Sequence, residues 1–523
     1  MASGLRRQQR RSSRLRPARN LWGGLPSLQA LTMPHQIHPL LKERTAGVLL
    51  HPTSLSAARG TTGVGDLGPA ARRFCEWMHR AGLKRWQMLP IGPVGAGDSP
   101  YSSLSSFAIE PMLASIADLV SDGWLPASVL RKSAAQKKSE HQDRSSWSRA
   151  RNHKLPLLEH AYDNFCHQSA RNRRAMAQFQ TFRKLQSSWL LPWTDFAVRQ
   201  SSWNKSIHSA KREYHAFVQW ILDRQWQALR KYASSLDIKF IGDLPIFCGA
   251  DSADVHANPE LFRLDRSGRP QVLTGCPPDP FAVDGQLWGH PHYRWAAHRK
   301  DNFAWWTKRA KVTLNRFDLV RIDHFIGFVR AYEVPGTAKH ARKGKWGRTP
   351  GRELLTKLAK ELGHLPFIAE DLGEVTPAVH RLRDEFKLPG MRILQWAFFD
   401  AEGQSNDLSH QHPRHCVVYP GTHDNDTIEG WHQSLDRAAK KNLQSYFGND
   451  SRLSPGKMLI QAALHSPANT AVIQMQDFLG HGRRSRMNVP GRPKGNWLWR
   501  LKPEDLKMKH ATKLHAHVKM TGR

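Results

Sequence analysis

The stretch FDLVRIDHFIGF, residues 317–328, decides the fold of this chain. It is a short apolar run that ends in a carboxylate, Asp323, and the same pattern recurs at Glu370 in PFIAEDLGE and at Asp424 in VVYPGTHDNDT. In a parallel barrel the body of each strand is buried, and its carboxyl end opens into the active site. The three stretches therefore predict parallel barrel strands whose ends carry acidic side chains.

Three carboxylates at one barrel mouth suggest chemistry on a glycosidic bond. That reaction needs a nucleophile, a proton donor and a group that stabilises the charge on the sugar. Each acid also has a polar neighbour, which is Arg321, Asp371 or His423. A structural salt bridge at a strand end is the competing interpretation of Arg321 and Asp323.

Five further apolar runs bounded by turn residues complete a set of eight candidate strands. In chain order the eight runs begin at Ala46, Lys84, Ile238, Phe317, Pro366, Met391, His415 and Thr470. Helical patterns lie between many of them, and the segment 217–233 is a clear amphipathic example before the third run. Eight strands with intervening helices predict an α/β fold, a (β/α)8 TIM barrel.

Two long excursions interrupt the barrel pattern. Residues from about 115 to 210 show helical patterns and no strand pattern, so we expect a mainly helical insertion near the barrel mouth. Residues from about 249 to 300 are rich in Gly and Pro, and we expect functional loops without regular structure there. We therefore predict a catalytic barrel over 43–505, with both insertions around its C-terminal face.

The charge of the chain is unusual. There are 78 Lys and Arg residues against 44 Asp and Glu residues, which gives a net charge of +34 and a pI near 10.4. Such values are common in nucleic-acid binders. Because the basic residues are spread along the whole chain, we interpret them as a solvated surface and predict no specific nucleic-acid partner.

The two ends of the chain are basic. The head, 1–42, contains no acidic residue, and its Arg cluster leaves three interpretations open: a disordered tail, translated sequence upstream of a start at Met33, or an organelle transit peptide. The tail, 506–523, shows no evident chemistry. We expect the cytoplasm as the compartment, or a plastid if the head is a transit peptide.

Cysteine usage and hydropathy narrow the class of protein further. The five cysteines are scattered without metal-ligand or disulfide spacing, which fits a reduced compartment. No run of eighteen apolar residues occurs, so no membrane-spanning helix is expected. Motifs for phosphate, nucleotide or metal binding are absent from the sequence, and we predict that the protein needs no cofactor.

Nine short motifs occur in a fixed order between about Gly47 and Trp499. They are GVLLHPTSL, GDSPYSSLSSFA, IGDLPIF, DSADV, GQLWG, RIDHF, AEDLG, THDNDT and RMNVPG. This ordered set resembles glycoside hydrolase family 77, the 4-alpha-glucanotransferases of the amylomaltase or disproportionating type. The resemblance implies transfer of α-1,4-glucan segments to the 4-hydroxyl of another glucan or of glucose. Expected substrates are maltooligosaccharides and glucans derived from starch or glycogen.

The resemblance also assigns roles to the three acids. It implies that Asp323 is the nucleophile, Glu370 the general acid/base and Asp424 the stabiliser of the transition state. Retention of configuration needs two inversions, so the first two carboxyls should lie about 5–5.5 Å apart. Glu370 must hold a proton, and we expect burial or the like charge of Asp371 to raise its pKa. Arg321 projects to the same side of the strand as Asp323 and should keep it ionised.

A wider set of polar and aromatic residues is expected to bind the sugar. The set comprises Arg321, His423, Tyr101, Ser99, Asp371, Asp243, Gln286, Trp288 and Asn488. The Tyr101 ring is suited to stacking on a glucose ring, with a core position as the alternative. Gln286 and Trp288 resemble a loop on the acceptor side, and Asp243 is expected at the pocket floor, with a purely structural role as its alternative.

Two other functions remain open at this point. A hydrolytic α-1,4-glucanase would use the same three acids. A polyanion- or glycogen-binding protein would carry them as a vestigial site, against which the intact set of acids argues. Incubation with maltotriose separates the two enzymes, because only a transferase makes chains longer than the substrate.

Overall fold

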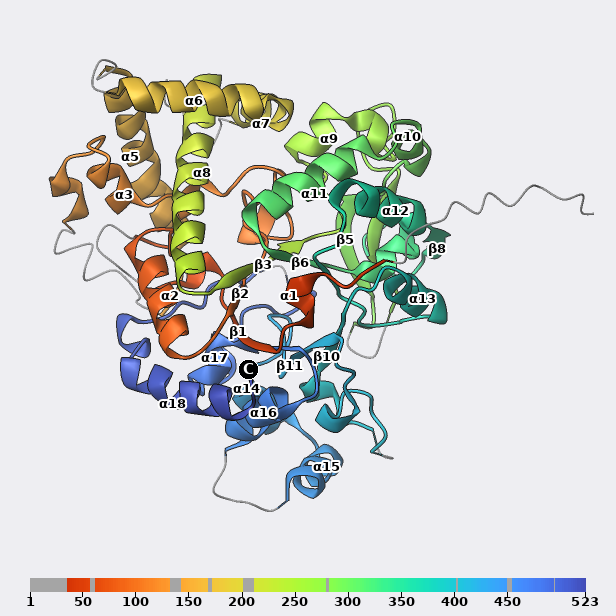
Figure 1. Ribbon diagram of the computed structural model, residues 1–523. Helices are drawn as coiled ribbons and strands as arrows, with labels where there is room; N and C mark the ends of the chain where they lie inside the picture. Colours follow the sequence, from red (N-terminus) through yellow and green to blue (C-terminus); the bar gives the residue numbers. More distant parts are fainter. Residues whose placement is uncertain are drawn as a thin grey trace, which may run out of the picture. The chain divides into compact units, whose positions relative to one another are not determined.

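In the computed structural model, eight parallel strands form the central sheet (Figure 1). They are β1 (Thr45–Leu49), β2 (Arg85–Gln87), β3 (Lys239–Leu244), β6 (Leu319–Ile322), β9 (Phe367–Ala369), β10 (Gly390–Ile393), β11 (Cys416–Tyr419) and β12 (Thr470–Gln474). Their order is β10-β11-β12-β1-β2-β3-β6-β9. The Ala369 N–H donates to the Pro389 carbonyl at 2.9 Å, which links β9 back towards β10. The sheet is thus nearly closed, and the predicted barrel with all eight of its strands is confirmed.

The structure describes most of the chain. The described residues are 35–56, 62–131, 143–167, 172–200, 211–278, 282–400, 403–448, 454–492 and 494–523. Most of the predicted basic head lies outside them. Gln36–Arg523 forms one compact unit.

The barrel strands are buried because helices cover the sheet. In β1, β6, β9, β11 and β12 every residue is buried. Trp86 of β2 shows the packing between layers, since its ring lies edge-on to Phe74 of α2 at 4.8 Å and to Phe240 of β3 at 5.4 Å. Strands covered on both faces read as continuous apolar runs, which is why the sequence revealed them.

Helices surround the barrel strands and fill the connections. Outside the first insertion they are α1 (Pro39–Lys42), α2 (Pro69–Arg80), α8 (Arg212–Ser235), α9 (Ala253–Ala257), α10 (Trp295–Lys300), α11 (Ala304–Arg316), α12 (Gly351–Leu362), α13 (Pro377–Glu385), α14 (Ile428–Ser434), α15 (Arg437–Phe447), α16 (Pro455–His465), α17 (Met475–Phe478) and α18 (Met508–Met520). The helix predicted over 217–233 lies within α8. The basic tail also forms a helix, α18, which packs against α2.

The first insertion is helical in its described residues. It contains α3 (Ile116–Ser121), α5 (Trp147–His167), α6 (Arg173–Leu185) and α7 (Ser187–Arg199). Figure 1 shows α5, α6 and α7 gathered around one end of α8. Rings from α5 and α6 meet those of α8, where Phe165 and Phe179 lie 5.3 and 5.4 Å from Trp220. This aromatic cluster anchors the insertion to the barrel.

The second insertion differs from the expectation of loops without regular structure. Its strands β4 (Val272–Cys276) and β5 (Gln286–Pro291) join β7 (Arg330–Pro335) and β8 (Lys345–Arg348) in an antiparallel sheet of order β5-β4-β7-β8. Gly275 is required there, because a Cβ on it would come within 2.3 Å of the Gln286 carbonyl oxygen. The expectation was wrong because β4 pairs on one side with β7, far away in the sequence, and one glycine in each of β4 and β5 interrupts the apolar alternation.

Candidate active site

Three barrel strands carry the predicted acids to the same place. Asp323 follows β6, Glu370 follows β9, and Asp424 lies in the loop after β11. The guanidinium of Arg321, inside β6, is 3.0 Å from Asp323 Oδ1 and 3.8 Å from Glu370 Oε2. The negative charge of Asp424 raises the pKa of both of these carboxyls. The structure therefore brings the three acids into one region, with Asp323 and Glu370 beside the same cation.

A fourth carboxylate fixes that cation. Arg321 Nη1 donates to both oxygens of Asp243, at the end of β3, at 2.8 Å each. The two side chains are almost completely buried, at 3% and 0% exposed. Burial lowers the pKa of Arg321, but the carboxylates of Asp243 and Asp323 outweigh it and raise the pKa above its ordinary value. The guanidinium is therefore a permanent charge in the floor of the site.

Glu370 and Asp323 titrate as neighbours. Burial raises the pKa of Glu370 to about 8; Arg321 lowers it and the charge of Asp323 raises it further. Burial also raises the pKa of Asp323 to about 7, against the closer contact of Arg321. Arg321 lies closer to Asp323 than to Glu370, which favours ionisation of Asp323 and leaves the shared proton on Glu370, the order that a nucleophile and a proton donor require.

The neighbour expected to raise the pKa of Glu370 does not do so. Asp371 is buried and points away, because its carboxylate pairs with Arg383 on α13 and accepts the Met391 N–H at 2.8 Å. The like charges that act on Glu370 belong to Asp323 and Asp424. The prediction that Asp371 raises the pKa of Glu370 was wrong, and the geometry of Asp371 is that of a tie between β9 and β10. Its predicted contact with the sugar stays a prediction.

A sharp turn after β6 aims a backbone donor at Glu370. His324 adopts a left-handed conformation with φ 51° and ψ 54°, which few residues other than glycine take. Its backbone N–H donates to Glu370 Oε2. The Trp288 ring meets the His324 ring edge-on at 4.8 Å. The turn thus orients the acid and places the His324 ring against Trp288 of β5.

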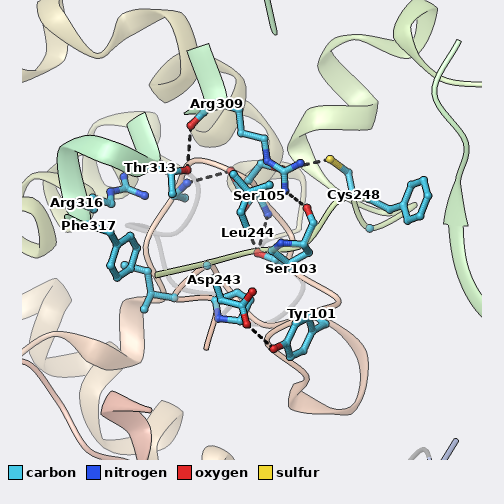
Figure 2. A pocket seen from close by; sticks show the side chains of 18 residues that line it. Tyr101, Ser103, Ser105, Asp243, Leu244, Cys248, Arg309, Thr313, Arg316 and Phe317 are labelled. Carbon is cyan, nitrogen blue, oxygen red and sulfur yellow. Dashed lines mark hydrogen bonds between the residues drawn. The ribbon is translucent and has the colours of Figure 1, made fainter. Parts of the chain in front are cut away.

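Tyr101 and His423 form one wall of the site. The Tyr101 hydroxyl donates to Asp243 Oδ2 at 2.6 Å, as Figure 2 shows, and lies 2.8 Å from His423 Nε2. The two rings are stacked with centroids 5.3 Å apart. Burial lowers the pKa of His423, so the imidazole is neutral. Because the tyrosine proton points to Asp243, His423 Nε2 is the donor towards Tyr101.

Asp424 is held by the segment that follows β12. The Asn488 side chain donates to Asp424 Oδ1 at 2.6 Å, and the Arg486 guanidinium donates to the Asp424 carbonyl at 2.6 Å. Asp424 remains 42% exposed in its side chain and therefore faces the open part of the site. Arg486 was not singled out from the sequence, although it begins the motif RMNVPG that contains Asn488.

The remaining predicted contacts lie in loops and strands around this group. Gln286 accepts a hydrogen bond from the Trp288 indole at 3.3 Å, so the two predicted acceptor-side residues contact each other. Ser99 Oγ accepts from the Tyr101 N–H at 3.3 Å and shapes the loop after β2. Sequence reasoning missed Trp497, whose ring is 5.8 Å from Tyr101 and 6.1 Å from His423.

Two further observations concern ligands and membranes. Within the described ranges, no three His, Cys, Asp or Glu side chains are grouped so that they could hold a metal ion. The absence of a cofactor stays a prediction. Over the same part of the chain, no helix combines the length and apolar character needed to cross a bilayer.

Known proteins share the sequence pattern of this chain over most of its length. The family model described as 4-alpha-glucanotransferase, of glycoside hydrolase family 77, matches residues 50–507. A 4-alpha-glucanotransferase of Thermus thermophilus is 40% identical over 511 residues, which cover 92% of this chain and 99% of the relative. The chloroplastic/amyloplastic 4-alpha-glucanotransferase of Solanum tuberosum is 38% identical, covering 88% of this chain and 82% of the relative.

A solved structure shows the same similarity at the level of the fold. Amylomaltase from Streptococcus agalactiae in complex with acarbose superposes with a TM-score of 0.86 at 31% identity, covering 92% of this chain and all of the other. The range matched by the family model, 50–507, spans the barrel and both insertions. The chain belongs to the 4-alpha-glucanotransferase family, glycoside hydrolase family 77.

Proposed function

We propose that the protein transfers segments of an α-1,4-glucan to the 4-hydroxyl of a second glucan, or of glucose, by a retaining double displacement. The observation that carries the proposal is the pairing of Asp323 and Glu370 on either side of the Arg321 guanidinium. Burial raises the pKa of both carboxyls, and the closer contact of Arg321 with Asp323 leaves the shared proton on Glu370. This arrangement places a candidate nucleophile and a candidate proton donor next to each other.

In the first displacement the Asp323 carboxylate attacks the anomeric carbon of the donor glucan. Glu370 gives its proton to the departing glycosidic oxygen, so the bond breaks and the glucan segment remains as an ester on Asp323. The close contact of Arg321 with Asp323 Oδ1 favours the ionised nucleophile. Since the cation is anchored by Asp243, it needs no rearrangement during the reaction.

In the second displacement the 4-hydroxyl of the acceptor attacks the same carbon. Glu370, now ionised, takes the hydroxyl proton, and the ester bond to Asp323 breaks. The exposed carboxylate of Asp424 and the neutral imidazole of His423 are proposed to bind hydroxyls of the distorted sugar. Asn488 fixes the direction of Asp424. Trp288 and Gln286 are proposed to contact the acceptor.

The cellular compartment of the reaction is also proposed. We place the reaction in the cytoplasm, or in a plastid if the basic head is a transit peptide. The potato relative is named as chloroplastic/amyloplastic.

Incubation of the purified protein with maltotriose tests the function. The expected products are glucose together with chains longer than maltotriose, because each released glucose leaves a maltosyl unit for another acceptor. Products that are all shorter than the substrate would instead indicate the hydrolytic alternative, which the family match disfavours. The Asp323→Asn variant is the control, since it keeps the shape of the side chain but lacks the nucleophile.

A further inference from the structure

A pocket lies behind the wall of the active site. Figure 2 shows it with Arg309, Thr313 and Arg316 of α11 on one side and Tyr101 and Asp243 on the other. The three α11 residues share one helix face, because they are spaced by four and three positions. The space accommodates a group about the size of a few water molecules.

Two buried cations line this pocket without a carboxylate partner. Arg309 is 3% exposed, and within the described residues its guanidinium donates only to neutral acceptors, the carbonyls of Pro245 and Ile246 and the Tyr293 hydroxyl. Arg316 is 8% exposed, and among the described residues no hydrogen-bond acceptor is found for its guanidinium. Its ring contact is with Trp189, at 5.7 Å.

The acids nearest to these cations do not neutralise them by contact. Against the effect of burial, the charge of Asp223 raises the pKa of Arg316, and the charge of Arg309 lowers the pKa of Asp254. Neither pair, however, comes within the 4.0 Å that defines an ion pair. Asp243 lines the pocket, yet both of its oxygens are already bonded to Arg321. Burial without a direct counter-ion is costly for a charge, so the pocket is complementary to an anion.

A third donor, the Ser105 hydroxyl, lines the same pocket. Ser105 is 3% exposed, and its hydroxyl oxygen accepts the N–H groups of Phe107 and Ala108 at 3.1 Å each. In the described part of the chain its own proton has no acceptor. A ligand that only accepts hydrogen bonds satisfies this hydroxyl and both guanidiniums, whereas water also needs acceptors.

We propose that this pocket is a binding site for a small inorganic anion, held by Arg316, Arg309 and the Ser105 hydroxyl. The site is separate from the three catalytic acids and does not depend on the proposed transfer reaction. A halide and a small oxyanion offer the same acceptor chemistry. The identity of the bound ion is therefore left to the two arms of the experiment.

Anomalous diffraction from crystals of the full chain tests the proposal, with sodium bromide in one arm and sodium selenate in the other. The expected result is an anomalous peak in the pocket at hydrogen-bond distance, about 3.0–3.5 Å, from the Arg316 guanidinium. A peak in only one arm identifies the class of anion. Peaks confined to the basic surface in both arms, with the pocket empty or holding water, would overturn the proposal.

Melting temperatures give an independent test in solution. Replacing gluconate by the anion found in the crystal, at about ten times its Kd, should raise the Tm of the wild-type protein by about 1–2 °C. Arg316→Gln should lose that increase, and Arg316→Lys should keep part of it. Arg437→Gln is the matched control, because it removes the same charge from an exposed position on α15. Equal increases in all variants would mean that the effect is general surface screening.

Discussion

At the scale of single residues, the division of labour between two carboxyls depends on their distances to one guanidinium. Arg321 contacts Asp323 at 3.0 Å but Glu370 only at 3.8 Å, while both carboxyls are raised in pKa by burial. The closer contact favours ionisation of Asp323, so the shared proton stays on Glu370. Without this difference in distance, the two carboxyls would have no reason to differ in protonation.

The Glu370→Gln variant tests the assignment of the proton donor. Transfer from maltotriose should fall by about 10²–10⁴-fold, because the glycosidic oxygen leaves without a proton. A glucosyl fluoride donor should react at a much less reduced rate in the first displacement, since fluoride leaves as an anion. Rates of fluoride release and of maltotriose consumption measure the two effects. An equal loss with both donors would contradict the role of Glu370.

The pH dependence of kcat/KM follows from the same pair. Activity requires ionised Asp323, with its pKa of about 7, and protonated Glu370, with its pKa of about 8. Activity should therefore decline as pH falls below about 7 and again as pH rises above about 8, in a narrow bell. In Glu370→Gln, assayed with the fluoride donor, the alkaline limb should disappear and the acid limb remain. A flat profile from pH 5 to 10 would be incompatible with these values.

At the scale of structural elements, the sequence revealed those parts that local patterns specify. The eight barrel strands are continuous apolar runs, and the acids at their ends were recognisable for that reason. The sheet of β4, β5, β7 and β8 was missed because its two strand pairs, β4 with β5 and β7 with β8, are joined by the non-local pairing of β4 with β7. The orientation of Asp371 was also missed, since the partner that turns it away, Arg383, lies on the following helix α13.

The segment 486–501, which follows β12, forms a strap that contacts the loops at the carboxyl ends of two barrel strands. It places Asn488 on Asp424, and its Leu501 N–H donates to the Ser54 carbonyl after β1 at 2.8 Å. Asn488 was recognisable because it lies in the motif RMNVPG. The aromatic contacts of Trp497 were not, because they depend on the path of the strap past Tyr101 and His423. The strap therefore connects the last barrel strand to the first and positions one catalytic acid.

Asn488→Ala tests this positioning role. The Asp424 carboxylate would lose a 2.6 Å donor and move among several orientations, so kcat/KM should fall by about tenfold or more. The Tm should change by less than about 2 °C, because Asn488 lies at a partly open site. Asn496→Ala, on the same strap but bonded to the Val489 and Arg492 backbone, is the control for general loosening. Equal losses of kcat/KM in both variants would show that Asn488 has no specific role.

At the scale of the whole molecule, the high positive charge includes arginines that support the barrel. Arg523 is largely buried and donates to the carbonyls of Leu464 at 2.7 Å, Thr45 at 3.0 Å and Ser466 at 2.9 Å. These carbonyls lie at the end of α16 and at β1. The basic tail thus ties a helix terminus to the amino-terminal side of the barrel, away from the acids.

Arg523→Ala therefore separates stability from catalysis. Removing several charge-assisted hydrogen bonds from a largely buried group should cost about 2–3 kcal/mol of the free energy of unfolding and lower the Tm by a few degrees. The value of kcat at 25 °C should stay within about twofold of wild type, because the catalytic acids lie at the opposite ends of the strands. Lys519→Ala, at an exposed position of α18, removes the same charge and should leave the Tm unchanged. If both variants melt at the same temperature as the wild type, the tail does not support the barrel.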